Sequence, residues 1–286
     1  MSFKRPNEND ITVTDAVRVD VRLSVPWRLR PGQYIYLCIL RAGLTSFAQM
    51  HPFYVAWGYR DEDGHDHAVL IVEKQDGFTK KIVAHAHAAE AFSDCPKLKA
   101  LIGGPYGQEM GLGFFGTVIL FATGIGIAAQ LPYISELLRD YSNNETRRIA
   151  LFWQVESEAW VADHMQELLS QDVNRILDIH LFVVGGFLSR NTRRGDIVSR
   201  GERIDVTYSA MDAKEIIGAE MNGRKGRVVI SLCVKDEINR EIRRAVRQRP
   251  ESSFHIKEIP FQPMDRKGYE DVLTALLKLA RLLFVR

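Results

Sequence analysis

The sequence predicts two domains of different class, an N-terminal antiparallel β domain followed by a parallel-sheet α/β domain. Three observations support this prediction. Apolar and polar side chains alternate with a period of two early in the chain, for example from Val17 to Leu23. From Thr117 onward, short β-branched runs alternate with segments of helical periodicity. A glycine-rich turn, Thr123-Gly124-Ile125-Gly126, stands where the first of these runs meets a helical segment.

Length and composition fit this organisation. The 286 residues are enough for two domains with a core each, and 46% hydrophobic with 26% charged residues is typical of a soluble globular protein. A net charge of +2 is too small to indicate a nucleic-acid partner. The three cysteines, Cys38, Cys95 and Cys233, lack ligand-like spacing. We therefore expect no metal site and no disulfide framework, and a reducing compartment is favoured.

The stretch from Phe114 to Ile134 is nearly uncharged and reaches the roughly 20 residues that a bilayer requires. Three glycines and a proline interrupt it, and it divides into a β-branched run and the small-residue start of a helix. A buried strand, turn and helix are therefore predicted in place of a membrane span. Polar and charged residues follow Met1 closely, so no signal peptide is expected.

Strands in the N-terminal half are separated by turn residues. Pro31-Gly32 marks one turn, and Asp61-Glu62-Asp63-Gly64 is typical of a hairpin. The whole β region is expected over residues 11–101. Its strands are expected over residues 17–23, 34–37, 49–58 and 68–72.

The C-terminal half is expected to form a parallel sheet. Ligands of such sheets lie at the carboxyl ends of the strands, which brings Thr123 to Gly126, Trp153, Gln154 and Ser231 to one rim. The glycine-rich turn lets backbone N–H groups approach a pyrophosphate beside the positive end of a helix. The expected strands cover residues 117–121, 148–153, 177–183 and 227–232, and the expected helices cover 128–141, 161–169 and 236–249.

Four motifs in a fixed order carry a resemblance to a known family: HPFY at 51–54, GFT at 77–79, GGPYG at 103–107 and TGIG at 123–126. Together they resemble the cytosolic half of the ferric reductase and NADPH oxidase branch of the ferredoxin-reductase superfamily, most closely the fungal ferric-reductase-like proteins. The resemblance extends from about Asp15 to Pro263. It implies that the first domain closes into a β-barrel that binds FAD, and that the second binds NADPH, with NADH as the alternative.

The same resemblance implies the domain boundaries. An FAD-binding barrel is expected over 11–108 and an NAD(P)-binding α/β domain over 114–263. The remaining residues, 264–286, are expected to form a helical extension, with apolar residues at helical spacing between Val272 and Leu283. We expect this helix to pack on the body or on another subunit, and a membrane-surface helix is the alternative.

For the flavin half, the resemblance places Pro52, Phe53 and Tyr54 against the isoalloxazine ring and His51 near the flavin phosphate or ribitol. A rigid X-Pro segment can orient an aromatic ring for stacking, and histidine can donate to a phosphate oxygen. Composition alone leaves open a strand histidine among core aromatics. Gly77-Phe78-Thr79 is expected to open a helix capped by Thr79, whose N–H groups receive the pyrophosphate, with a capped surface helix as the alternative. The remaining flavin contacts implied are Gly104, Pro105, Tyr106 and Gly107.

For the nicotinamide end, relatives carry a Cys-Gly-Pro after the late strand. Here that strand ends Ile230-Ser231-Leu232-Cys233. We expect Ser231 to take the position of the family cysteine, and Cys233 to lie beside it or to be a core thiol. Phe261 is the expected counterpart of the aromatic residue that covers the flavin in the superfamily.

Nucleotide choice rests on two opposing groups of charges. Glu156 and Glu158 follow the second strand, where an acidic residue favours a ribose 2′-hydroxyl. Arg190, Arg193 and Arg194 supply positive charge for a 2′-phosphate if their loop folds back to the adenosine end. NADPH is favoured, and Arg193 is the expected contact.

The expected function is an NAD(P)H-dependent flavin oxidoreductase of ferric-chelate reductase type. Electrons would pass from NADPH through FAD to a haem domain, a ferric chelate or dioxygen, on the cytoplasmic side of a membrane. In the family a haem-binding membrane domain precedes these modules, so haem is expected only there, and contact with that domain or with a membrane surface stays open. A free-standing NAD(P)H:acceptor flavoreductase and a catalytically inactive nucleotide-binding module are the alternatives. The sequence sets neither the acceptor nor the oligomeric state.

Overall fold

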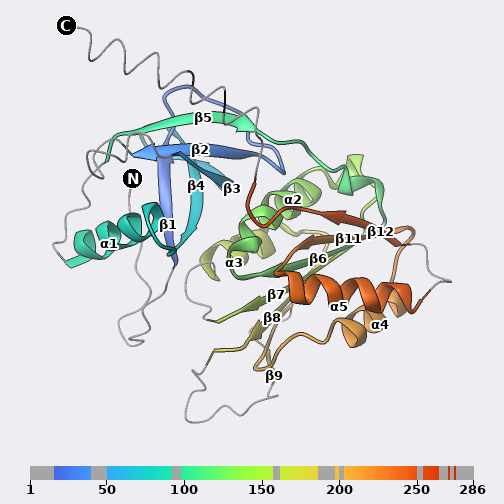
Figure 1. Ribbon diagram of the computed structural model, residues 1–286. Coiled ribbons are helices and arrows are strands. Elements are labelled where there is room, and N and C mark those ends of the chain that lie inside the picture. Colours follow the sequence, from blue (N-terminus) through green and yellow to red (C-terminus); the bar gives the residue numbers. More distant parts are fainter. Residues whose placement is uncertain are drawn as a thin grey trace, which may run out of the picture. The chain divides into compact units, whose positions relative to one another are not determined.

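A computed structural model describes residues 16–39, 50–91, 98–156, 162–185, 197–199, 203–249 and 254–263, together with Glu270 and Thr274. Its contacts divide the chain into two compact units. The first holds the described residues up to Glu109 and those from Gln262 onward, and the second is Met110–Phe261. Figure 1 labels the helices and strands of both units, which are described separately below.

Unit 1 is built on a five-stranded antiparallel sheet with the order β1-β4-β3-β2-β5. The hairpin predicted at Asp61–Gly64 joins β3 to β4, and Gly64 has the positive φ of +80° that this turn requires. One helix follows β4 (Figure 1). The elements are β1 (Ala16–Arg22), β2 (Tyr34–Ile39), β3 (His51–Arg60), β4 (Asp66–Glu73), α1 (Phe78–Ala91) and β5 (Ala100–Tyr106).

The core of unit 1 follows from the alternation of side chains along these strands. Ile35 and Leu37 of β2 pack with Val19, Leu70 and Phe78 on one face of the sheet. A second, smaller cluster lies on the other face of β2 and is rich in tyrosine. All six residues of β2 are buried, because a core cluster covers each face of this strand.

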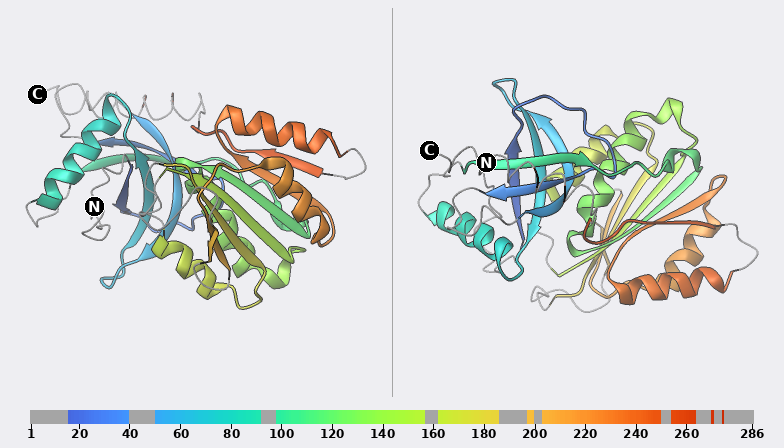
Figure 2. Two further views of the ribbon diagram at one scale, coloured as in Figure 1. Left: turned by 90° about the horizontal axis from the view of Figure 1, so that it is seen from below. Right: turned by 45° about the horizontal axis from the view of Figure 1, so that its top comes forward.

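Unit 2 contains a seven-stranded sheet with the order β12-β11-β6-β7-β8-β10-β9, parallel except for β9. Four described helices connect the strands, and they cover the two faces of the sheet in pairs (Figure 2). The strands are β6 (Thr117–Thr123), β7 (Arg148–Val155), β8 (Leu177–Val183), β9 (Ile197–Ser199), β10 (Ile204–Thr207), β11 (Val228–Cys233) and β12 (Phe254–Glu258), and the helices are α2 (Ile127–Arg139), α3 (Ala162–Gln171), α4 (Ala213–Asn222) and α5 (Asp236–Arg247).

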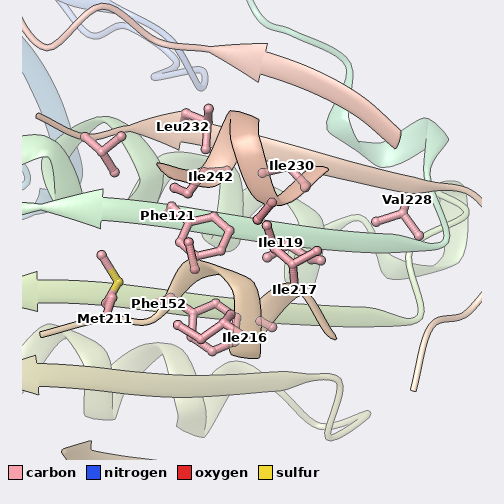
Figure 3. Close-up of a cluster of buried hydrophobic side chains, with 14 of the residues drawn as sticks. Ile119, Phe121, Phe152, Met211, Ile216, Ile217, Val228, Ile230, Leu232 and Ile242 are labelled. Carbon is pink, nitrogen blue, oxygen red and sulfur yellow. The ribbon is translucent and has the colours of Figure 1, made fainter. Parts of the chain in front are cut away.

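The main core of unit 2 lies between the sheet and the α4–α5 pair. Phe121 of β6 and Phe152 of β7 stack with ring centroids 5.4 Å apart, and Ile217 of α4 and Ile242 of α5 close over them (Figure 3). Ile230 of β11 points into this core, so its neighbour Ser231 faces the opposite side of the sheet, toward α2. The strand, turn and helix predicted between Phe114 and Ile134 are confirmed as β6, the 3₁₀ turn η3 (Gly124–Gly126) and α2.

The sequence analysis found most of these elements but gave no individual strand or helix for five of them: β5, β9, β10, α4 and β12. Among the described residues, no helix combines the length and the apolar character needed to cross a membrane. The helix expected near the C-terminus lies outside the described residues except for Glu270 and Thr274, which are both helical.

Candidate functional site: a nucleotide turn and a flavin strand

The glycine-rich turn of unit 2 joins β6 to α2. Gly124 has a positive φ of +48°, and Gly124–Gly126 form a short 3₁₀ turn before α2 begins at Ile127. No side chain caps the start of α2. The first N–H groups of a helix have no partner inside it, so they face the space beyond the turn. This arrangement can hold a pyrophosphate, as the sequence predicted.

Neighbouring side chains brace this turn. Trp153 is 1% exposed, and its Nε1 donates a hydrogen bond of 2.9 Å to the carbonyl oxygen of Gly124. The Thr123 hydroxyl oxygen accepts a bond of 2.9 Å from the backbone N–H of Lys235, which ties β6 to the segment after β11. Gln154 accepts a bond of 2.9 Å from the backbone N–H of Met211. Trp153 and Thr123 therefore support the turn through bonds within the protein, whereas Gln154 joins the end of β7 to the segment before α4.

The end of β11 corrects one expectation. β11 continues to Cys233, which pairs with Ala122, whereas Ser231 pairs with Leu120 in the middle of the sheet. Ser231 is therefore not at the rim, and the residue at the strand end is Cys233. The sequence analysis ended this strand one residue too early, because an apolar run contains no signal for its last residue.

Cys233 lies directly beside the turn. A Cβ atom added to Gly126 would come within 2.2 Å of the Cys233 carbonyl oxygen and 3.2 Å of its sulfur. Only glycine permits this approach. Burial, with a smaller contribution from Glu258, raises the pKa of the Cys233 thiol to about 12. The group is thus a neutral thiol at physiological pH and is not an activated nucleophile.

The Ser231 side chain has a hydrogen-bond partner in α2 that the sequence analysis missed. Its hydroxyl donates to the Gln130 side-chain oxygen at 2.9 Å, and the Gln130 amide donates to the Phe121 carbonyl oxygen at 3.1 Å. Both side chains are fully buried. This chain of bonds fixes α2 on β6 and β11, directly behind the turn. An uncharged glutamine in an apolar helix gave only a weak sequence signal.

In unit 1, the HPFY motif opens β3, and the strand alternation divides it. Phe53 pairs with Ile35 and His51 with Leu37, both residues of the main core. Pro52 and Tyr54 project to the other face, where Tyr54 pairs with Tyr34. Pro52, Phe53 and Tyr54 therefore cannot all present their side chains to one face of one ring. Their contact with flavin remains a prediction, and the two faces are separate candidates for it.

The structure brings two of the predicted flavin motifs together. The His51 ring stacks on Phe78 with centroids 4.5 Å apart and an interplanar angle of 17°. The ring centroid of Phe53 lies 6.5 Å from that of Phe78. Burial lowers the pKa of His51 below its ordinary value, so its imidazole is neutral at pH 7 and can donate a hydrogen bond from one nitrogen only.

The helix expected at GFT is present, but Thr79 is not its cap. α1 begins at Phe78, so Thr79 lies inside the first turn, and its hydroxyl exchanges hydrogen bonds of 2.8 and 3.2 Å with the backbone of Gln75. Gly77 precedes the helix with φ +87°, and a Cβ atom there would meet nothing within 4 Å. The start of α1 is therefore open beside Gly77 and fits an anionic group.

The GGPYG motif is part of a strand. β5 runs through it and ends at Tyr106, whose ring centroid lies 5.8 Å from that of Tyr34. Gly107 has φ +92°, and a Cβ atom there would lie 2.2 Å from the Gly32 carbonyl oxygen. Gly104 has φ +126° and packs against the Tyr34 carbonyl and the Tyr106 ring. These glycines permit the backbone of β5 to approach the turn that precedes β2.

The charged residues and the aromatic residue predicted for the nucleotide end complete the set of predicted site residues. Arg193, with Arg190, Arg194 and Glu158, lies outside the described residues. Glu156 is exposed just after the end of β7. Phe261 is half-buried and follows β12 after two residues.

Comparisons with known proteins identify the class of protein. A family model described as an FAD-binding domain matches residues 6–110. A second, described as the ferric reductase NAD binding domain, matches residues 115–259, half of the chain. The pair defines a protein with one flavin domain and one nicotinamide-nucleotide domain. The chain belongs to the ferric reductase family.

Curated relatives are consistent with this assignment. "Ferric reductase transmembrane component 5" of Saccharomyces cerevisiae is 25% identical over 232 residues, which cover 75% of this chain and 32% of the relative. "Probable cell surface ferric reductase kap2" of Aspergillus oryzae is 25% identical over 59% of this chain and 23% of its own length. The chain thus spans about a third or less of these two relatives.

Solved structures share the fold at low sequence identity. The cytochrome P450 reductase GcoB of Amycolatopsis has a TM-score of 0.55 at 13% identity and covers 91% of this chain and 68% of its own. The CS-b5R domains of human Ncb5or have a TM-score of 0.56 at 13% identity, covering 90% and 67%. Ferredoxin-NADP+ reductase of Plasmodium falciparum has a TM-score of 0.55 at 11% identity, covering 89% and 92%. The predicted fold class, a flavin β domain followed by a nucleotide-binding α/β domain of ferredoxin-reductase type, is confirmed.

Proposed function

We propose that this chain is the electron-transfer module of a ferric-reductase-type enzyme, which takes electrons from NADPH and passes them through FAD to a haem or metal acceptor. One observation supports this more than any other. The α2 helix begins without a side-chain cap at a turn in which Gly126 is packed against the backbone of Cys233. Such an end binds a nucleotide pyrophosphate without help from a charged side chain.

The residues of the chain have positioning roles in this proposal. Bound FAD and NADPH supply the hydride and single-electron chemistry. In unit 2, Trp153 and Thr123 hold the turn so that its N–H groups remain aimed at the nucleotide. In unit 1, the open start of α1 beside Gly77 receives the flavin phosphates, and neutral His51 donates to the same end of the cofactor. No acid or base is required for hydride transfer itself.

Three finer assignments belong to the same proposal. Cys233 takes the place at the strand end that the sequence analysis gave to Ser231, and Phe261 covers the flavin until nicotinamide enters. Arg193 contacts the 2′-phosphate of NADPH, with NADH as the alternative nucleotide. The domains extend over 11–108 and 114–263, followed by a helical extension at 264–286.

The acceptor is proposed from the relatives. Their names describe a transmembrane component and a cell-surface ferric reductase, so we place this module on the cytoplasmic side of a membrane, beside a haem-bearing domain. A free-standing reductase with soluble acceptors is the alternative. Val234-Lys235 follow Cys233 where relatives carry Gly-Pro, and this difference favours slow turnover or an inactive nucleotide-binding module as a second alternative.

The proposal is tested with the purified chain. Its visible spectrum near 450 nm is recorded with and without added FAD, and NADPH or NADH is then added without oxygen. We expect FAD to bind and to bleach faster with NADPH. A protein whose spectrum shows no FAD binding would contradict the proposal. If FAD binds but neither nucleotide bleaches it, the result would support the inactive nucleotide-binding module. Rates with ferric chelates and with quinones then distinguish the two reductase hypotheses.

A further inference from the structure

The β3–β4 hairpin of unit 1 carries a group of metal-ligating side chains that the proposed function does not use. One ligand atom from each of Asp61, Asp63 and His65 lies within 4.8 Å of the other two. We infer that this hairpin binds one zinc-like divalent cation through Asp61, Asp63 and His65. The sequence analysis expected no metal site, because it judged metal binding from the cysteines and not from this turn.

The hairpin holds Asp61 in one orientation. Its Oδ1 accepts a hydrogen bond of 2.7 Å from the backbone N–H of His65, and its Oδ2 accepts one of 2.8 Å from Nε2 of His67. The backbone bond, aided by the bond from His67, lowers the pKa of the Asp61 carboxyl to about 2. Asp61 is therefore ionised and fixed in place, as a ligand of a cation has to be.

His67 is itself fixed by a ring contact. It stacks on Tyr59 with centroids 4.9 Å apart and an interplanar angle of 12°, and its side chain is only 11% exposed. Metal-bound carboxylates are commonly oriented by a hydrogen bond from a neighbouring residue of this kind. We therefore give His67 the role of holding Asp61 toward the cation.

Two buried ring nitrogens point to a ligand at the hairpin. Nδ1 of His65 and Nδ1 of His67 are both buried, and neither has a hydrogen-bond partner in the structure. Buried polar atoms are nearly always paired with protein, water or an ion, so each unpaired one requires an explanation. A cation bound to His65 Nδ1 explains the first, and a water bound to the same cation explains the second.

There is room for such water beside the hairpin. A cavity of about 280 Å³ is lined by Asp61, Asp63 and His67, together with residues of β1, β2 and β5. Three protein ligands leave at least one position of a zinc-like ion to water. The cavity thus accommodates the part of the coordination sphere that the side chains do not supply.

The separation of the two best-placed ligand atoms matches a tetrahedral ion. Nδ1 of His65 lies 3.4 Å from Oδ1 of Asp61. Ligand atoms about 2.1 Å from a tetrahedral zinc are roughly 3.4 Å from one another. One cation can therefore contact both atoms without a change in the hairpin. Asp63 is exposed, so its side chain can rotate to complete the set.

The donor atoms select the kind of ion. An imidazole combined with carboxylates suits Zn²⁺ and similar transition-metal ions, whereas Mg²⁺ and Ca²⁺ prefer oxygen ligands alone. The purified chain is therefore titrated calorimetrically with Zn²⁺ and with Mg²⁺. Co²⁺ serves as a spectroscopic probe, because a thiolate ligand gives a charge-transfer band that aspartate and histidine lack. We expect one Zn²⁺ per chain, no heat from Mg²⁺ at the same concentration and no thiolate band.

Matched substitutions in the turn locate the ion. Asp63→Asn and Glu62→Gln each remove one exposed carboxylate, and only Asp63 belongs to the group of ligands. We expect D63N and His65→Gln to weaken Zn²⁺ binding by about tenfold or more, and E62Q to leave it nearly unchanged. His67→Phe keeps a ring on Tyr59 but removes the bond to Asp61, and it should weaken binding by about tenfold.

Four results would overturn the inference. The first is a parent chain that binds no Zn²⁺, and the second is Mg²⁺ binding as tight as that of Zn²⁺. The third is equal weakening in D63N and E62Q, because the turn would then attract cations by charge alone. The fourth is unchanged binding in D63N and H65Q or a thiolate band with Co²⁺, either of which would place the ion elsewhere in the chain. None of these measurements requires FAD or NADPH, so the outcome is independent of the proposed function.

Discussion

The two glycine-rich motifs of this chain have similar composition but opposite structural roles. GGPYG lies in and just after β5, where the strand pairs with β2 and the glycines let backbone segments approach. TGIG follows β6 and opens α2, where backbone N–H groups have no partner within the helix. The first motif therefore shapes a surface of side chains, and the second presents main-chain donors.

Within each motif one glycine is required by packing. Gly107 faces Gly32 in unit 1, and Gly126 faces Cys233 in unit 2. Gly124 is required for its φ of +48°. The comparison teaches that a conformational requirement and a packing requirement can occur in one motif, and substitutions separate them.

The largest effect is expected at Gly126. Gly126→Ala places a Cβ atom 2.2 Å from the Cys233 carbonyl oxygen and 3.1 Å from its carbonyl carbon, and backbone cannot move aside as a side-chain tip can. We expect a loss of about 3 kcal/mol in the free energy of unfolding of unit 2. Denaturant titration measures this free energy. An unchanged value in the variant would show that the backbone at Gly126 and Cys233 can move apart to admit a methyl group.

Gly107→Ala should cost a similar amount, about 3 kcal/mol, in unit 1, because its Cβ atom would lie 2.2 Å from the Gly32 carbonyl oxygen and its φ of +92° strains an L residue. The loss should come with weaker FAD retention and unchanged NADPH affinity. Isothermal titration with each cofactor gives both values. Equal losses of affinity for FAD and for NADPH would contradict separate roles for the two motifs in binding the two cofactors.

Gly124→Ala tests the backbone conformation that the turn requires. Alanine at φ +48° is strained by about 1–2 kcal/mol. We expect weaker NADPH binding with FAD occupancy unchanged. Gly64→Ala is the matched control, since Gly64 has φ +80° and open space around it but lies in the β3–β4 hairpin. If both variants lower NADPH affinity alike, Gly124 has no special role in the turn.

Trp153→Phe removes one brace of the turn and keeps most of the buried ring. The lost hydrogen bond from Trp153 Nε1 to the Gly124 carbonyl oxygen should cost about 1 kcal/mol. We expect a modest rise in KM for NADPH with little change in kcat, since Trp153 acts by positioning. A fall in kcat alone would contradict this role.

The smallest effect concerns pH and belongs to unit 1. Burial lowers the pKa of His51 below 6.5, so below that value the unfolded chain binds the proton more readily than the folded one. The stability contributed by neutral His51 is complete above pH 6.5 and is lost as the pH falls toward the folded pKa. His51→Phe keeps a stacked ring on Phe78 and should flatten this part of the pH profile of unfolding. His180 of unit 2, whose pKa burial also lowers, should keep its own slope in both proteins.

The sequence predicted those elements that carry a strong local pattern. β8 was predicted with its observed bounds, and β6 and α5 to within two residues. α4 was missed, although Asp212 and Glu215 form the spacing of a capping box and Asp212 does accept from the N–H groups of Lys214 and Glu215. The short strands β9 and β10 had too few residues to show a period.

Long-range contacts had no sequence signal. Arg148 of β7 donates to Glu220 of α4 at 2.7 and 2.8 Å and to Asp178 of β8 at 2.8 Å, and burial of Glu220 to 6% exposure makes this a specific brace. Nothing in the local sequence of Arg148 indicates a partner 72 residues away. The link between Gln130 and Ser231 spans 101 residues and was missed for the same reason.

The sequence alone determined the order of the modules and the placement of glycine at each turn, and its resemblance to known proteins supplied the family and the cofactor classes. The order of the modules and the glycine positions depend on local properties, namely side-chain periodicity and the backbone freedom of glycine. Tertiary structure decided which face of β3 each motif residue occupies, that Cys233 and not Ser231 ends β11, and that tyrosines of β2, β3 and β5 meet in one cluster. Those outcomes depend on strand register, and a shift of one residue moves every side chain to the opposite face.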